Sequence, residues 1–259
     1  MIDLNDALKL AVSAAHSAGE ILKSRFKTEL NVQTKTSERD LVTEVDKAAQ
    51  DAVIKIIQDA YPDHRFIAEE DGAKNLGDAN CPYTWIIDPL DGTTNFVHKK
   101  PEHATMIALQ ENDELILGVI YYPSADRMFT GIKGGGAFID GKPVQLRETK
   151  NMLDAVLCTC MLQRAEKSPD GRLMVPIPDC SSVHNYGCAA YELGDVLLGR
   201  NDGAFFEHVG FWDVAAGCLM ISEAGGKHRI ELDQKDPRKV AKCVASTPKI
   251  FDELCDFLW

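Results

Sequence analysis

The hydrophobic spacing of this chain changes period near residue 62, and that change limits its fold more than any other feature. Residues 4–26 and 43–60 place apolar side chains at helical spacing, and Pro62 ends the second segment. Six short segments between residues 65 and 144, among them TWIIDPL and ELILGVIYYP, then read as strands separated by turns. Asp140-Gly141 predicts a hairpin turn between the last of them. This order predicts a mixed α/β (α+β) protein.

The second part of the chain repeats the alternation in a looser form. We expect strands at 155–160, 203–207 and 239–247, and helices at 186–199, 212–225 and over the last ten residues. Residues 163–180 are polar and contain prolines, so we expect a loop there. The sequence thus predicts two α/β parts, 1–148 and 149–259.

Charge and composition exclude several classes of protein. The net charge is −12 over 259 residues, and the longest basic clusters, at 98–100 and 227–229, are short. Nucleic-acid binders usually show a basic stripe, so this class is disfavoured. There is no leader-like start and no apolar run long enough to span a bilayer, which predicts no membrane insertion. Eight cysteines without CxxC or zinc-like spacing favour a cytoplasmic location.

Acidic residues follow two neighbouring predicted strands. Glu69-Glu70-Asp71 ends one strand, and Asp88 and Asp91 end the next. If these strands are neighbours in the sheet, their carboxylates converge, and converging carboxylates repel each other unless cations lie among them. Ligands that are all oxygen suit Mg²⁺ or Mn²⁺ rather than zinc. The sequence therefore predicts a site for divalent cations, which would also let an acidic protein accept an anionic substrate.

The residues after these acids complete the predicted site. Pro89 and Gly92 bend the chain, so the Leu90 carbonyl can face the cations as a further oxygen ligand. Gly92-Thr93-Thr94 would then begin a helix whose free N–H groups can receive a phosphate. Asp213, in FWDVAAG, and Asp46, in LVTEVD, are further candidates.

Structural roles are the alternative for each acid taken singly. Asp213 before a helix reads as an N-cap, Asp88 as a turn residue, and Asp71 as a solvated strand end. Neither capping nor a helix dipole explains three separate acidic ends around one apolar core. The combination of the three therefore favours the cation site.

These residues resemble one known family. D88-P-L-D-G-T-T-N-F96 and W212-D-V-A-A-G217 look like the two signatures of the inositol monophosphatase family, and I-A-E-E at 67–70 resembles its preceding acidic pair. The 31–46 segment, GGGAFIDGKPV and E223-A-G-G226 extend the resemblance over nearly the whole chain. The resemblance implies a layered αβαβα sandwich of the inositol monophosphatase / sugar phosphatase type and a Mg²⁺-dependent, lithium-sensitive phosphatase. It also implies a homodimer, and two or three Mg²⁺ ions per site for which Mn²⁺ can substitute.

The resemblance also implies a role for each matching residue. The implied metal ligands are Glu69, Asp88, the Leu90 carbonyl, Asp91 and Asp213, and the implied catalytic set adds Thr93 and Asp46, which orient the attacking water. The implied substrate contacts are Glu69, Leu90, Asp91, Gly92, Thr93, Thr94, Gly187, Cys188, Ala189, Glu207 and Asp213, with Gly187, Cys188, Ala189 and Glu207 on the alcohol side. A metal-activated water would attack phosphorus in line, without a covalent enzyme intermediate. We expect Cys158, Cys160, Cys188, His98 and His103 to be structural or peripheral.

The resemblance is weakest on the alcohol side of the substrate. Glu207 lies six residues before Asp213, where relatives usually have seven, so either Glu207 or His208 could contact the substrate. His184 stands where bacterial relatives often have Arg, and the 160–182 region is shorter than usual. The predicted substrate is an inositol monophosphate-like small phosphorylated alcohol, with histidinol phosphate or a sugar (bis)phosphate as alternatives. A dimeric interaction protein with residual phosphatase activity is the alternative outside enzymes.

Overall fold

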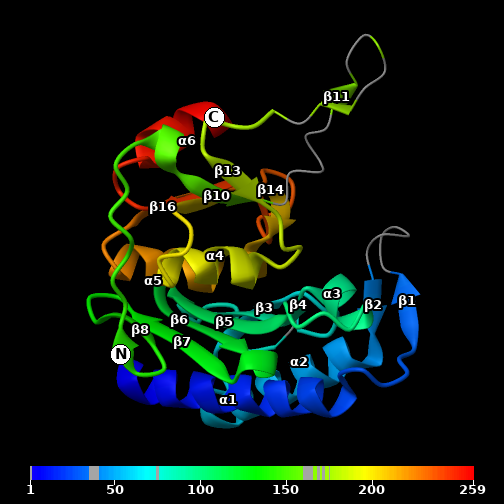
Figure 1. Ribbon diagram of the computed structural model, residues 1–259. Helices are drawn as coiled ribbons and strands as arrows, with labels where there is room; N and C mark the ends of the chain where they lie inside the picture. Colours follow the sequence, from blue (N-terminus) through cyan, green and yellow to red (C-terminus); the bar gives the residue numbers. More distant parts are fainter. Residues whose placement is uncertain are drawn as a thin grey trace.

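Helices and sheets alternate in layers through the whole molecule (Figure 1). The computed structural model describes residues 2–34, 41–73, 76–159, 166–167, 170, 173–174 and 176–259. The outer helical layer contains α1 (Leu4–Arg25) and α2 (Glu44–Ala60). The middle helical layer contains α4 (Ala189–Leu197) and α5 (Ala215–Glu223), and α6 (Phe251–Leu258) covers the far side. The predicted αβαβα sandwich is confirmed.

A seven-stranded sheet lies between the outer and the middle helices, in the order β3-β4-β5-β6-β7-β8-β9. β3 runs parallel to β4, and every other neighbouring pair is antiparallel. The strands are β3 (Arg65–Ala68), β4 (Tyr83–Asp91), β5 (Ala104–Glu111), β6 (Glu114–Tyr122), β7 (Arg127–Ile132), β8 (Gly136–Ile139) and β9 (Lys142–Pro143). The six predicted strand segments all lie in this sheet, and the predicted hairpin joins β8 to β9.

A five-stranded sheet lies between the middle helices and α6, in the order β13-β10-β14-β16-β15. Its strands are β10 (Val156–Thr159), β13 (Ser182–His184), β14 (Gly203–Gly210), β15 (Lys227–Leu232) and β16 (Lys239–Ser246). β10 is parallel to both of its neighbours, so the carboxyl ends of three strands meet at one edge. Short elements complete the chain: β1 (Val32–Thr34), β2 (Leu41–Thr43), α3 (Thr93–Val97), η1 (Pro123–Ala125), η2 (Met152–Asp154), β11 (Glu166–Lys167), β12 (Leu173–Met174) and η4 (Phe211–Asp213).

Small side chains let the outer helices pack closely on the large sheet. The face of α1 that meets α2 and β6 carries fully buried alanines at 7, 11, 14, 15 and 18. Asp3 caps the start of α1, and Thr43 caps α2 in a reciprocal capping box with Asp46. Among the described helices, none combines the length and the apolar character needed to cross a bilayer.

Several predicted boundaries differ from the structure. Sequence analysis missed β15, whose residues Lys227–Leu232 are mostly charged, because it is an edge strand with only one side paired. The predicted helix 186–199 begins only at Ala189, since Gly187 has a φ of 66°. The predicted helix 212–225 divides into η4 and α5. β11 and β12 pair inside the predicted loop 163–180, and Cys160, expected in a strand, lies outside the described residues. The division at residue 148 stays a prediction.

Candidate metal centre

The acidic site begins where the buried strand β4 ends. All nine residues of β4 are buried, and β3 beside it ends at Ala68. The amide of Glu69 continues the ladder by donating to the Ile87 carbonyl at 3.2 Å. This pairing places Glu69 beside Asp88, as the sequence predicted.

A break in the ladder turns both aspartates of β4 to one side. The register with β5 shifts between Asp88 and Asp91, around Pro89, which has no N–H to donate. The amide of Leu90 donates to Asp88 Oδ1 at 3.0 Å, and the hydroxyl of Thr105 donates to the Pro89 carbonyl at 2.9 Å. These two hydrogen bonds hold the bend that carries both carboxylates.

Asp213 reaches the same site from the smaller sheet. It ends η4, directly after β14, and η4 packs against β4 and β5. Its Oδ2 accepts from the Gly210 amide at 2.8 Å. Helix α5 has Val214 at its N-cap position, without a side-chain cap. Asp213 therefore does not cap α5, as the structural alternative predicted, but one of its oxygens caps the start of η4.

A small cavity of about 200 Å³ brings the predicted ligands together. Carboxylates and backbone dominate its lining, and no lysine, arginine or histidine is among its described lining residues. The lining residues are Leu41, Glu69, Asp88, Leu90, Asp91, Gly92, Thr93, Thr94, Gly187 and Asp213. Four carboxylates thus share a cavity in which none of the described lining side chains supplies a compensating positive charge.

The raised pKa values of these carboxyl groups show that their close packing is unfavourable in the cation-free protein. Burial, followed by repulsion from the neighbouring carboxylates, raises the pKa of Asp88 well above its ordinary value. The same two causes raise the pKa of Asp213 well above its ordinary value. Burial also raises the pKa of Asp91, although hydrogen bonds from Cys188 and Ala190 oppose the shift. Divalent cations would remove this penalty, and oxygen donors of this kind fit Mg²⁺.

Within the described residues, no three histidine, cysteine or acidic side chains are arranged to hold a metal ion as they stand. The assignment of a cation to this cavity therefore rests on its charge and on the type of its donors.

Thr93 connects the cavity to the buried carboxylate of Asp46. The Thr93 hydroxyl lies 2.9 Å from Asp46 Oδ1 and 3.0 Å from the Leu90 carbonyl. The other oxygen of Asp46 accepts from the amide and the hydroxyl of Thr43 at 2.9 and 2.6 Å. Asp46 itself is fully buried and is not among the cavity lining. It can act on the reaction only through Thr93.

Gly92 is required at the turn into α3. Its φ is 82°, and a Cβ placed on it would lie 2.8 Å from the Glu102 carbonyl and 3.2 Å from the Cβ of Cys188. Only glycine meets both conditions without strain. The turn points the residues Gly92, Thr93 and Thr94 into the cavity, as predicted.

The predicted alcohol contacts divide into two groups. Gly187 lines the cavity, whereas the thiol of Cys188 and the amide of Ala190 contact Asp91 Oδ2 at 3.0 and 2.6 Å. Glu207 and His208, in the outer half of β14, are not among the lining residues. The structure therefore brings the predicted metal ligands together around one cavity, whereas Gly187 is the one predicted residue of the alcohol side that lines it.

Sequence reasoning missed two amide side chains that hold the site. Gln50 of α2 accepts from the Glu70 amide at 2.9 Å and donates to the Glu70 carbonyl at 3.0 Å. Asn95 donates to the carbonyls of Glu102 and Tyr186 at 2.9 and 2.8 Å. Both residues could have been noticed in the sequence. Gln50 is a polar residue on the apolar face of its helix, and Asn95 belongs to the DPLDGTTNF stretch.

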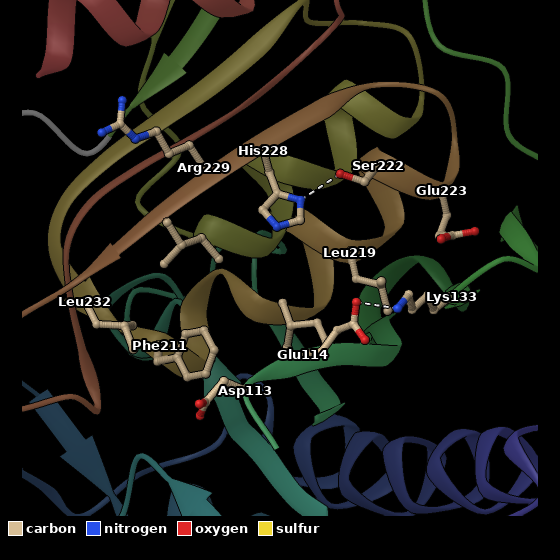
Figure 2. A pocket seen from close by; sticks show the side chains of 12 residues that line it. Asp113, Glu114, Lys133, Phe211, Leu219, Ser222, Glu223, His228, Arg229 and Leu232 are labelled. Carbon is tan, nitrogen blue, oxygen red and sulfur yellow. Dashed lines mark hydrogen bonds and ion pairs between the residues drawn. The ribbon is translucent and has the colours of Figure 1, made fainter. Parts of the chain in front are cut away.

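A larger cavity of about 540 Å³ lies elsewhere, between α5, β15 and the β5–β6 turn (Figure 2). Ser222 and Nδ1 of His228 lie 2.6 Å apart in it, and Lys133 pairs with Glu114. Its charges of both signs are distributed around an apolar floor that includes Leu219 and Phe211. The smaller acidic cavity, where charges of one sign converge, is the stronger candidate for the active site.

Comparison with known proteins identifies the family of the chain. The model of the inositol monophosphatase family matches residues 3–256. The chain is 37% identical over 227 residues to the Nus factor SuhB of Pasteurella multocida, covering 86% of this chain and 84% of that protein. It is 34% identical over 264 residues to an inositol monophosphatase of Mesembryanthemum crystallinum, covering 98% and 96%. The solved inositol monophosphatase of Anabaena superposes with a TM-score of 0.80 at 31% identity, covering 99% and 96%.

Proposed function

The chain belongs to the inositol monophosphatase family, and from that premise we propose that it is a Mg²⁺-dependent phosphomonoesterase acting on an inositol monophosphate-like alcohol. The observation that carries the proposal is the cavity in which four carboxylates meet without a positive side chain among its described lining residues. A phosphate ester could approach such a cavity only with cations bound, because the bare site would repel it.

The proposed ligands of Mg²⁺ are Glu69, Asp88, the Leu90 carbonyl, Asp91 and Asp213, with room for two or three ions and for Mn²⁺ in their place. Bound Mg²⁺ would lower the pKa of a coordinated water and stabilise negative charge on the leaving oxygen. The chain's own task is to hold these oxygens and the ester in a fixed arrangement, since phosphoryl transfer depends mainly on positioning and electrostatics.

Thr93 is proposed to orient the attacking water. When its hydroxyl donates to Asp46 Oδ1, 2.9 Å away, its lone pairs face away from that bond and can accept a hydrogen bond from the water. Asp46 thus fixes the orientation of the Thr93 hydroxyl, although it does not line the cavity itself. This pair would aim the water without any covalent intermediate on the enzyme.

The backbone of Gly92, Thr93 and Thr94 is proposed to receive the phosphate oxygens, and the segment Gly187-Cys188-Ala189 with Glu207 the alcohol. Gly187 is the member of that segment that lines the cavity. We also propose that the protein is a lithium-sensitive homodimer of the cytoplasm.

The test is phosphate release from a panel of esters at several Mg²⁺ concentrations. The panel contains inositol 1-phosphate, histidinol phosphate and fructose 1,6-bisphosphate. We expect Mg²⁺-dependent turnover of at least one ester, and its loss in Asp213→Asn with the circular dichroism spectrum unchanged. If no ester is hydrolysed with Mg²⁺ or Mn²⁺ present, or if Asp213→Asn retains full activity, the proposal is wrong.

A partner-binding role is the second candidate, because one relative is named a Nus factor. Asp91→Asn in the natural host separates the two roles. A cellular phenotype that survives the loss of turnover would favour the partner role.

A further inference from the structure

One buried carboxylate near the metal centre has no part in the proposed reaction. Glu192 lies in the first turn of α4, and its side chain is fully buried. Its Oε1 accepts from the amide of Tyr186 at 3.2 Å, and the amide of the next residue, Gly187, donates to Asn185 Oδ1 at 2.8 Å. Its Oε2 has no hydrogen-bond partner among the described residues. A buried carboxylate is costly, so its retention here calls for a compensating role.

The segment that Glu192 holds is also held from the opposite side. Asn95, which follows the acidic turn of β4, donates to the carbonyl of Tyr186 at 2.8 Å. Glu192 therefore binds the N–H of Tyr186 while Asn95 binds the carbonyl of the same residue. Neither is a backbone–backbone bond of a helix or a sheet, and Gly187 has a φ of 66°, which glycine adopts without strain. Side chains therefore hold the backbone of this segment: Glu192 and Asn95 at Tyr186, and Asn185 at Gly187.

This segment forms a wall of the active-site cavity. Gly187 lines the cavity, and the next residue, Cys188, has its thiol 3.0 Å from Asp91 Oδ2. A shift of Tyr186–Gly187 would therefore move the wall that meets the alcohol, while Asp91 keeps its bond from the Ala190 amide at 2.6 Å.

We propose that Glu192 is a positioning residue for alcohol recognition, which fixes the Gly187 wall of the cavity by accepting the N–H of the preceding residue, Tyr186. The inference rests on the proposed phosphatase function and names a residue that decides which alcohol fits. Because Glu192 is not among the residues that line the cavity, its loss should change substrate affinity more than turnover.

The environment of Glu192 indicates which replacement should preserve this role. Burial raises the pKa of Glu192 to about 8, although the N–H donors of the segment oppose the shift. The neutral carboxyl is therefore the main form at pH 7. Glutamine is neutral, has the same shape and keeps one oxygen that can accept the Tyr186 N–H. Methionine has a similar volume and accepts hydrogen bonds only weakly.

The experiment compares Glu192→Gln with Glu192→Met on two esters. One is the hydroxyl-rich ester that wild type hydrolyses best in the panel above, and the other is p-nitrophenyl phosphate, whose aromatic alcohol has no ring hydroxyl. For Glu192→Met we expect KM for the hydroxyl-rich ester to rise about tenfold or more with kcat within about threefold, since small displacements of positioning groups have effects of this size. KM for p-nitrophenyl phosphate should stay within about threefold. Glu192→Gln should match wild type on both esters.

Equal changes for both esters, or a Glu192→Gln variant as impaired as Glu192→Met, would overturn the inference. If Glu192→Met does not fold, Asn95→Ala removes the opposite hold and must show the same selective rise in KM; its absence overturns the inference as well. Failure of the proposed function is distinguishable, because wild type would then hydrolyse neither ester with Mg²⁺ present.

Discussion

Replacing Asp88 by asparagine should stabilise the cation-free protein while it abolishes activity. Asp88 is 2% exposed, and burial and the neighbouring carboxylates raise its pKa. Asparagine keeps the oxygen that accepts from the Leu90 amide at 3.0 Å, so the turn should be preserved. It removes the charge that the bare site cannot accommodate. We therefore expect that Asp88, a proposed metal ligand, destabilises the folded protein when no cation is bound.

The sign of the pH dependence follows from the raised pKa. The folded protein holds the Asp88 proton more tightly than the unfolded chain, whose value is about 4. The folded state is therefore favoured at low pH, and stability falls as the pH rises from about 4 through the raised folded value. Leaving a buried charge uncompensated costs about 3 kcal/mol or more. Relief of about 3 kcal/mol corresponds to a Tm higher by about 6–12 °C in a protein of this size.

The assay is thermal unfolding in chelator from pH 4 to pH 8, repeated in millimolar Mg²⁺. We expect the Tm difference between Asp88→Asn and wild type to be near zero at pH 4 and largest at pH 8. In Mg²⁺ the wild type should gain stability and the variant little, because its ligand set is incomplete. Asp113→Asn is the matched control, since Asp113 is exposed on the β5–β6 turn. If Asp88→Asn melts below wild type in chelator at pH 8, the assignment of repelling carboxylates is refuted.

Three further substitutions test the parts around the metal centre. Thr93→Val removes the hydroxyl that lies 2.9 Å from Asp46. Its kcat should fall about 100-fold at unchanged Tm, and Thr93→Ser should recover most of the activity. An equal loss of kcat in both variants would contradict the water-orienting role. Gln50→Leu frees the Glu70 backbone and should raise the Mg²⁺ concentration for half-maximal activity about tenfold, as a Mg²⁺ titration of phosphate release would show. Gly92→Ala puts a methyl group 2.8 Å from the Glu102 carbonyl oxygen at a φ of 82°. This variant should have a Tm lower by several degrees and no turnover. Wild-type Tm and activity in the variant would contradict the turn geometry.

The sequence predicted the fold, and it named acids that the structure brings into one cavity, because both depend on local patterns. Buried strands such as β4 are apolar along their whole length, and the acids that follow them stand at their ends. Since β3 and β4 are parallel neighbours, acids at the ends of both must meet. The edge strand β15 was missed for the opposite reason, because its charged residues give no strand signal until β16 pairs with them.

The alcohol side of the site could not be predicted in the same way. The backbone before Gly187 is held at Tyr186 by Asn95 and Glu192, which are remote from each other in sequence. Glu207 was expected at the alcohol although its spacing from Asp213 differs by one residue from that of relatives, and the structure leaves it outside the cavity lining. Spacing along a chain does not report on such contacts.

The sequence alone determined which residues carry oxygen ligands, where the strands that present them end, and the chemistry that such ligands support. The tertiary structure decided that Asp213, from a different sheet, completes the acidic cavity, and that Thr93 links this cavity to Asp46. The tertiary structure also decided which further residues line this cavity. The physical reason is that ligand type and strand pattern are properties of short segments. Repulsion between carboxylates, burial of side chains and hydrogen bonds between remote residues arise only once distant segments pack together.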